Sequence, residues 1–173
     1  AGYILIGVVA VSQLGAASMI FYLTAYLISN LAAFGVVVIF WQVTGTDEIS
    51  AYAGLSRRSP GLALAMMVAF LSLAGMPPLA GFVAKVFVFA AAVQADYIWF
   101  AVVGVLNSII GLYYYLTVLK VVYLYRSEEE DKPMQVSRPN MIAIAVLSVG
   151  IILFGTLFGP WFSFSEQIAA AIF

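Results

Sequence analysis

The sequence contains no cysteine and no histidine among its 173 residues. It therefore excludes disulfide scaffolds, metal sites built from thiolates or imidazoles, Cys or His nucleophiles and haem ligation. Charge is also scarce, because 9% of residues are charged and the formal net charge is −1, which excludes a basic surface for nucleic acid. Apolar residues make up 65% of the chain and the mean hydropathy is +1.10, against about 45–50% apolar residues in soluble domains. The chain is expected to be an integral membrane protein.

Apolar runs of about 20 residues predict an all-α polytopic helix bundle in a single membrane domain, residues 1–173. The first run is too short to cross a hydrocarbon core of roughly 30 Å, and it lacks the pattern of a signal peptide. We therefore expect a partial first helix and a chain that is the C-terminal part of a longer protein. The expected helices are residues 1–12, 19–41, 61–93, 97–125 and 140–159, followed by an interfacial tail at 160–173.

The segment 61–93 is interrupted near its middle, so it could cross the membrane once or twice. The distribution of basic residues in the flanking loops distinguishes the two. Basic residues gather in the loops 42–60 and 126–139 and are absent from the intervening turn and the C-terminal tail. A single crossing puts both basic loops on one side, as the positive-inside rule requires. We expect these loops to be cytoplasmic and the C-terminus to lie on the opposite side, with the acidic run at 128–131 in solvent. The segment is then one helix broken at Gly75, Pro77, Pro78 and Gly81.

Lys85 follows this break and lies near the centre of the predicted span, 11 residues or roughly 16 Å of helix before Asp96. A lysine at this depth costs about 2.5–3.5 kcal/mol, so it should face the bundle interior and serve a function. Its affinity for protons depends strongly on burial and on neighbouring charge, which suits reversible proton transfer. The alternative is a lysine that only pairs with a carboxylate on another helix. No Asp or Glu lies at membrane depth in this sequence, so an acidic partner would lie elsewhere.

Several other polar residues fall inside predicted helices. Ser29 and Asn30 on one helix, and Asn107 and Tyr115 on a later one, could bind water along a proton path beside Lys85. Polar and small residues at helical spacing also serve as contacts between membrane helices, so both interpretations stay open. Lys120 lies near the basic end of its helix, where it can snorkel to the interface or act as a second proton relay.

The sequence shows no motif for bond-making chemistry. It has no glycine-rich phosphate loop, no paired catalytic carboxylates and no nucleophile elbow. We therefore expect no metal and no cofactor to be bound by this chain.

Several motifs, with LSLAGMPPLAGFVAK at residues 71–85 the most specific, resemble the N-subunit family of the proton-pumping NADH–quinone oxidoreductases, respiratory complex I. AGYILIG at 1–7, YLISNLAAFG at 26–35 and GLYYYL at 111–116 resemble the same family. TGTD at 44–47 and YAGL at 52–55 are similar to the photosynthetic branch of that subunit. The resemblance covers nearly the whole chain.

The resemblance implies an antiporter-like fold with fourteen helices and two inverted repeats, each containing a broken helix. This chain would supply part of helix ten and helices eleven to fourteen, with Lys85 at the lysine position of the broken twelfth helix on the proton path. Lys120 falls where relatives carry a basic residue. The implied partners are other membrane subunits, including neighbouring antiporter-like subunits, and lipid. NADH, flavin mononucleotide, iron–sulfur clusters and quinone would belong to other subunits. The implied location is the bacterial cytoplasmic membrane or an energy-transducing organelle membrane.

Three functions stay open at this point. The first is redox-driven proton translocation through a half-channel centred on Lys85. The second is a subunit of a cation/proton secondary antiporter without a redox partner, which the same broken helix and lysine would serve. The third is a structural membrane scaffold in which the lysine only holds an ion pair between helices.

Overall fold

The computed structural model describes residues 2–127 and 132–171 of the chain. Within these ranges the secondary structure is helical and contains no β-strand, which confirms the all-α class expected from the sequence. The elements are, in chain order, α1 (Gly2–Val9), α2 (Gln13–Thr44), the 3₁₀ turn η1 (Ile49–Tyr52), α3 (Leu55–Arg58), α4 (Pro60–Ala74), α5 (Ala80–Gln94), α6 (Ile98–Leu124), α7 (Arg138–Thr156) and α8 (Phe158–Ala169).

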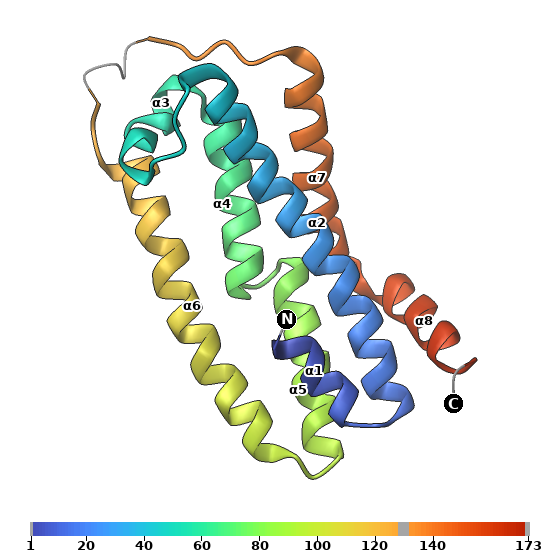
Figure 1. Cartoon of the computed structure of the whole chain (residues 1–173). Helices are drawn as coiled ribbons and strands as arrows, with labels where there is room; N and C mark the ends of the chain where they lie inside the picture. The colour runs from blue at the N-terminus through green and yellow to red at the C-terminus, as the bar shows by residue number, and fades with distance from the viewer. Residues whose placement is uncertain (1, 128–131, 172–173) are drawn as a thin grey trace.

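The helices pack around α2, which contacts α1, α4, α5, α7 and α8 (Figure 1). Helices α4 and α5 follow one another end to end, and α6 runs back alongside both of them. The short helix α1 lies beside α5, and α8 turns away from α7 to pack on α2. The junction between α4 and α5 therefore lies inside the bundle, at about half its height.

Among the described residues, three helices are long and apolar enough to cross a membrane, namely α2, α6 and α7. Helices α4 and α5 are also apolar, but each has 15 residues and is too short for a full span of about 20 residues. Because they follow one another end to end, α4 and α5 together have enough residues for one crossing, with an interruption at residues 75–79 (Figure 1).

The helix ends differ from the expected ones where local capping decides them. Helix α2 begins at Gln13 rather than near residue 19, because the Ser12 hydroxyl accepts a 3.0 Å hydrogen bond from the Gly15 N–H and caps the first turn. The expected break at 75–81 is too long, since Gly81 already belongs to the first turn of α5. The tail expected at the interface contains α8, whose Phe162 and Ala169 are buried in the core.

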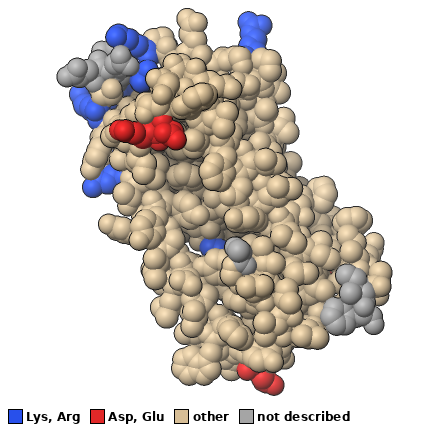
Figure 2. Space-filling view, viewed as in Figure 1, with Lys and Arg blue, Asp and Glu red and all other residues tan. Residues whose placement is uncertain are grey.

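Charge is segregated along the bundle. Of the seven Lys and Arg residues, all except Lys85 belong to residues 57–58 or 120–138. Lys and Arg atoms accordingly gather at the end of the molecule formed by α3 and the start of α7 (Figure 2). The turn at the other end, between α5 and α6, contains Asp96 as its single charged residue. The acidic run at 128–131 lies outside the described residues.

Within the described residues, two clusters of buried side chains form the core. One joins α2, α4, α5, α7 and α8 around Phe21, Val88 and Ile151. The other joins α2, α4 and α6 near the basic end, where Phe40 stacks on Tyr52 with ring centroids 3.9 Å apart. Burial raises the pKa of Tyr52, which lies outside the helical spans, to about 12, so that its hydroxyl stays protonated at neutral pH.

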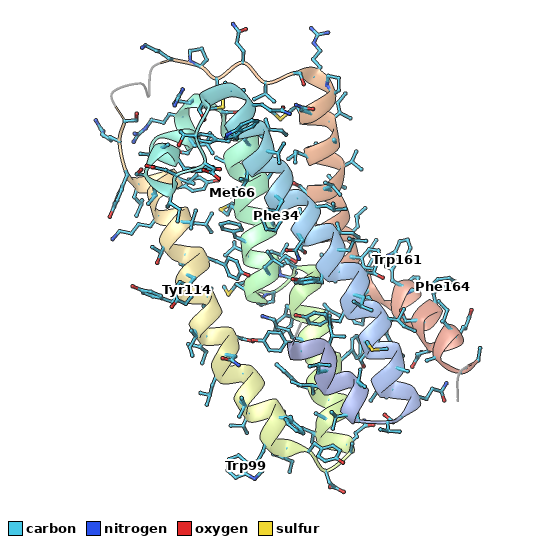
Figure 3. All side chains as sticks on the ribbon, in the orientation of Figure 1. Phe34, Met66, Trp99, Tyr114, Trp161 and Phe164 are labelled. Atoms are coloured by element: carbon cyan, nitrogen blue, oxygen red, sulfur yellow. The ribbon has the colours of Figure 1, made fainter. Side chains whose placement is uncertain are left out.

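Large apolar side chains also cover the outside of the bundle, as a lipid environment permits. Phe34, Trp99 and Tyr114 are each at least 65% exposed, whereas Met66 is buried between helices (Figure 3). Helix α6 is the most exposed of the three spanning candidates, with 11% of its apolar window buried. This outward-facing apolar surface indicates contact with lipid or with further membrane helices.

The buried position of Ile151 predicts a large effect of truncation. Ile151 is fully buried, whereas Val149 on the same helix is 53% exposed. We expect Ile151→Ala to destabilise the fold by about 2–5 kcal/mol, because the removed atoms leave a cavity. Val149→Ala is the matched control and should change stability little. Thermal unfolding of the detergent-solubilised protein, followed by circular dichroism, measures both, and an equal loss in the two variants would contradict this core.

Candidate functional site

The C-terminal end of α4 is closed by a glycine in the left-handed conformation. Gly75 has φ 89°, and its N–H donates to the Ser72 carbonyl at 2.9 Å. The Met76 N–H donates to the Leu71 carbonyl at 2.9 Å. These two bonds are those of a Schellman motif, which satisfies the carbonyls of the last turn except the final two. The carbonyls of Leu73 and Ala74 therefore need donors from outside the helix.

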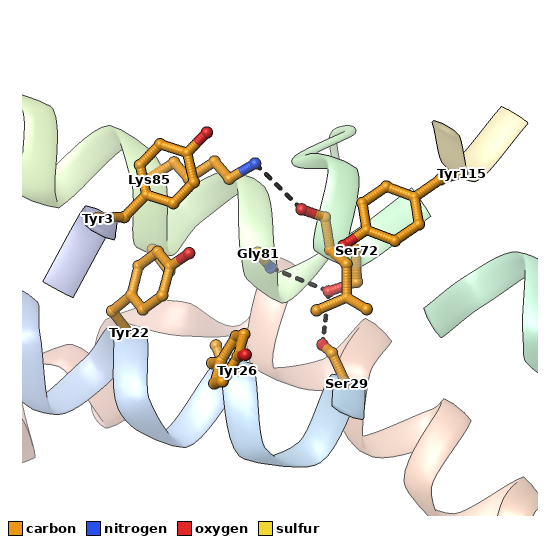
Figure 4. Close-up of a pocket in the computed structure, with 11 residues that line it drawn as sticks. Tyr3, Tyr22, Tyr26, Ser29, Ser72, Gly81, Lys85 and Tyr115 are labelled. Atoms are coloured by element: carbon orange, nitrogen blue, oxygen red, sulfur yellow. Dashed lines mark hydrogen bonds between the residues drawn. The ribbon is translucent and has the colours of Figure 1, made fainter. Parts of the chain in front are cut away.

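Lys85 supplies these donors from the second turn of α5. Its Nζ donates to the Leu73 carbonyl at 3.0 Å (Figure 4) and to the Ala74 carbonyl at 2.8 Å. The C-terminal end of a helix carries partial negative charge, so the protonated amine is stabilised there both by hydrogen bonds and by the helix dipole. The side chain is 6% exposed. The broken helix thus creates an acceptor pair, and Lys85 occupies it.

Lys85 lines three cavities formed by residues that the structure describes. A cavity of about 200 Å³, here called the inner cavity, lies between α1, α2, α4, α5 and α6 (Figure 4). Its lining includes the hydroxyl-bearing residues Tyr3, Tyr22, Tyr26, Ser29, Ser72 and Tyr115. A cavity of about 420 Å³, here called the side cavity, lies between α1 and α6 and includes Asn107 and Ser108. A third of about 260 Å³ lies between α5 and α6 and is mostly apolar. No Asp or Glu is among the described residues that line these three cavities.

A pair of serine hydroxyls connects α2 to both halves of the broken helix. Ser29 on α2 and Ser72 on α4 share a hydrogen bond of 2.9 Å, and both side chains are buried. Ser72 Oγ also accepts a 3.1 Å hydrogen bond from the Gly81 N–H at the start of α5. One hydroxyl therefore satisfies a free donor of α5 while it ties α4 to α2.

Gly81 is required for space rather than for an unusual backbone conformation, which corrects the expectation that glycine at this position permits unusual backbone dihedral angles. A Cβ at this position would overlap the Ser72 carbonyl oxygen and would lie 2.7 Å from the Ser72 carbonyl carbon. Of the two glycines at the break, only Gly75 has a positive φ. Gly81 permits the start of α5 to touch the last turn of α4, which brings Lys85 to the carbonyls.

Tyr3 on α1 packs against Lys85 at the wall of the side cavity. The Lys85 Nζ lies 5.0 Å from the centroid of the Tyr3 ring, within the range of a cation–π interaction. The Tyr3 hydroxyl shares a 3.1 Å hydrogen bond with Ser108 Oγ and donates to the Gly104 carbonyl at 3.3 Å. The ring and the hydroxyl of Tyr3 therefore connect Lys85 to the polar side of α6.

The structure brings some of the residues predicted from the sequence together with Lys85 and leaves others apart. Ser29 and Tyr115 line the inner cavity, and Asn107 lines the side cavity. Asn30 instead lines a separate groove between α2 and α7 and donates to the Tyr26 carbonyl at 2.8 Å. Its assignment to the Lys85 path is therefore corrected, because neighbouring residues of an α-helix point about 100° apart.

Lys120 lies away from this site. It is exposed near the end of α6, with its Nζ 5.6 Å from the centroid of the Tyr125 ring, and it lines none of the three cavities at Lys85. Its role as a second proton relay stays a prediction.

Sequence reasoning missed Tyr3 and Ser72. Ser72 lies within the motif at 71–85, three residues before Gly75, and its position in the last turn of α4 could have indicated a contact across the break. Tyr3 gave no such signal, because its contact with Lys85 depends on how α1 packs. Within residues 2–127 and 132–171 no group of three or more acidic side chains is placed to hold a metal ion.

Comparison with known sequences gives the relatives of this chain. A family model described as "NADH:quinone oxidoreductase/Mrp antiporter, TM" matches residues 1–111. The NADH-quinone oxidoreductase subunit N of Moorella thermoacetica is 39% identical over 173 residues, which are 100% of this chain and 36% of that protein. The NAD(P)H-quinone oxidoreductase subunit 2 of Rippkaea orientalis is 41% identical over 156 residues, 88% of this chain and 30% of that protein. The chain spans about one third of the length of these relatives.

Solved structures share the fold. A chain of the Mrp complex from Dietzia superposes with a TM-score of 0.89 at 25% identity, covering 97% of this chain and 40% of that chain. A chain of respiratory complex I from Thermus thermophilus with bound NADH gives 0.84 at 26% identity, covering 98% and 36%. The match of the family model to residues 1–111, more than half of the sequence, shows membership. The chain belongs to the family of transmembrane subunits shared by NADH:quinone oxidoreductases and Mrp antiporters.

Proposed function

We propose that this chain is part of a proton-translocating membrane subunit of an NADH–quinone oxidoreductase and that Lys85 carries the proton. The observation that supports this most is the position of the Lys85 amine, which is buried beside the broken helix, bonded to two backbone carbonyls and open to polar cavities on two sides. The family provides the assignment to the enzyme complex.

Proton transfer at Lys85 needs an amine that stays in place in both of its protonation states. The ammonium has three N–H groups, and two of them point to the Leu73 and Ala74 carbonyls. After the ammonium gives a proton to a water molecule, the neutral amine still has two N–H groups for these carbonyls and gains a lone pair. That lone pair accepts the next proton from a water on the other side. The carbonyls thus hold the nitrogen while its charge changes.

The inner cavity and the side cavity, each with some polar groups on its walls, are proposed as the routes to and from this amine. The inner cavity has tyrosine and serine hydroxyls on its walls, and the side cavity has Asn107 and Ser108. Each is several times larger than the roughly 30 Å³ that one water occupies in the liquid, and hydroxyl and amide groups give such waters partners. Ser29 and Tyr115 would orient water in the inner cavity, and Asn107 would do so in the side cavity.

The surroundings of the chain are proposed from its family and its charge. Residues 1–173 would form a single membrane domain at the C-terminal side of a larger subunit, next to other antiporter-like subunits and lipid. The basic end would face the cytoplasm of a bacterium, because positive residues favour that side. NADH, flavin, iron–sulfur clusters and quinone would be bound by other subunits.

The second candidate function is cation/proton exchange without a redox partner. It is favoured by the superposition on a chain of the Mrp complex from Dietzia, whose TM-score of 0.89 exceeds the 0.84 for complex I with bound NADH. The two functions differ in what drives the proton. Quinone reductase activity of the purified assembly supports the first, and sodium-dependent proton exchange without an electron donor supports the second.

Replacement of Lys85 tests the proposed role directly. In the assembled complex in sealed membrane vesicles, Lys85→Met should lower proton translocation by about tenfold or more, because methionine has similar length but cannot carry a proton. Lys132→Met, in the basic loop, is the control and should pump like the wild type. Proton uptake is followed with a pH-sensitive dye. Unchanged pumping by an assembled Lys85→Met complex would refute the role of Lys85.

The same assay applied to Lys120→Met tests whether Lys120 is a second proton relay.

The Tyr3 hydroxyl provides a finer test of the route through the side cavity. Tyr3→Phe keeps the ring beside Lys85 but removes the hydroxyl that contacts Ser108. We expect proton translocation to fall by about two- to tenfold, the effect of losing one hydrogen bond of roughly 0.5–1.5 kcal/mol. Tyr113→Phe is the control, because Tyr113 is 69% exposed on the outer side of α6. Equal pumping by the two variants would exclude the Tyr3 hydroxyl from the route.

A further inference from the structure

Gly155, near the end of α7, rests directly on the backbone of the break. A Cβ at this position would overlap the Pro78 carbonyl oxygen and would lie 2.5 Å from the Leu79 carbonyl carbon and 2.6 Å from the Ala80 nitrogen. These are backbone atoms, which cannot turn aside as the end of a flexible side chain can. Any side chain at residue 155 would therefore move either α7 or the segment that joins α4 to α5.

Helix α8 makes a second contact with the same broken helix. Phe162 is 8% exposed and stacks on Phe87, with ring centroids 3.7 Å apart and an angle of 13° between the ring planes. Phe87 is two residues from Lys85 on α5. Near the bend between α7 and α8, Phe154 stacks on Trp161 at 4.6 Å, which fixes the two helices relative to each other. The unit formed by α7 and α8 thus holds α5 at its beginning and at its middle.

Neither contact belongs to the site itself. Gly155 and Phe162 are absent from the linings of the inner cavity, the side cavity and the third cavity at Lys85. Their effect on Lys85 must pass through the relative position of α4 and α5. That position matters because Lys85 belongs to α5 while its two acceptors, the Leu73 and Ala74 carbonyls, belong to α4. Hydrogen bonds of this kind are lost when the two halves separate by about 1 Å.

We propose that Gly155 is a positioning residue which, together with Phe162, keeps the α4–α5 break closed so that the Lys85 amine meets the Leu73 and Ala74 carbonyls. The effect of Gly155 on proton transfer rests on the proposed function of Lys85. Its geometric part, the position of the break, stands on the packing of α7 and α8 alone. In this proposal, glycine at residue 155 serves proton transfer as well as helix packing.

The test compares two glycines of α7 in the complete, membrane-embedded enzyme complex. Gly155→Ala should lower the number of protons translocated per electron pair by about threefold or more, because a small displacement of Lys85 slows proton transfer relative to electron transfer. Gly150→Ala is the matched control, because a Cβ there would lie 3.8 Å from Ile28 Cγ2, an ordinary contact. A ratio equal to the wild type in the assembled Gly155→Ala complex would overturn the proposal.

A double variant separates positioning from a general loss of stability. If Gly155 acts through Lys85, Gly155→Ala should cause no further loss of pumping in a Lys85→Met background, because the interaction it maintains is already gone. A merely structural role would lower pumping by the same factor in both backgrounds, and that result would also overturn the proposal.

Electron cryomicroscopy of the Gly155→Ala complex provides a readout that does not depend on pumping. Separation of Lys85 Nζ from the Leu73 and Ala74 carbonyls beyond about 3.5 Å is expected, and retention of both bonds would refute positioning. If Lys85→Met alone pumps normally, the proposed function fails, and the geometry of the Gly155→Ala complex still decides the positioning role by itself.

If Gly155→Ala does not assemble, the same test uses α8. Phe162→Leu removes the stack on Phe87, whereas Phe164→Leu on the same helix changes a side chain that is 61% exposed. The proposal is supported if Phe162→Leu translocates fewer protons per electron pair than Phe164→Leu. This difference between the two variants should disappear when each is combined with Lys85→Met. Equal ratios in the two leucine variants overturn it.

Discussion

An α-helix that ends inside a bundle leaves carbonyl groups without hydrogen-bond partners. In this chain, the need to supply donors for these carbonyls determines the arrangement of the site. The Schellman bonds at Gly75 satisfy part of the last turn of α4, and the Leu73 and Ala74 carbonyls accept from Lys85. The lysine would be costly at this depth without those acceptors, and the carbonyls would be costly without the lysine. Each therefore stabilises the other, and the interruption of the helix and the buried charge form one feature.

This arrangement requires backbones to approach each other closely at two points. Gly81 permits the start of α5 to touch the last turn of α4, and Gly155 permits α7 to touch the segment between them. The Ser29–Ser72 hydrogen bond holds the same region from the side of α2. The break is thus enclosed by α2, α7 and its own two half-helices, which explains how a non-helical segment can persist at membrane depth.

The family includes transmembrane subunits of both NADH:quinone oxidoreductases and Mrp antiporters. The fold is shared with chains of respiratory complex I from Thermus thermophilus and of the Mrp complex from Dietzia. Under the proposed function, the gain and loss of a proton by Lys85 would follow the same chemistry in either setting. The two proposed functions differ in what would drive that transfer, which the packing described above does not distinguish.

Much of the fold could be predicted from the sequence, because the lipid environment imposes long apolar runs and places charges at the ends. The all-α class, the interruption near Pro77 and the isolation of Lys85 from other charges follow from such runs. Helix ends were less predictable, since Ser12 starts α2 earlier than its apolar run does. The wrong placement of Asn30 beside Lys85 has a related cause, because neighbours on a helix face different sides and periodicity does not say which side is the inner one.

By itself, the sequence determined that a lysine lies deep in an apolar bundle beside a segment that cannot be helical, because composition and proline chemistry act locally. Only the tertiary structure decided which groups meet that lysine. Tyr3, Ser29 and Tyr115 come from three different helices, and Gly155 is 70 residues further along the chain than Lys85. Their meeting depends on how the helices pack and rotate, which is set by long-range contacts that no local pattern records.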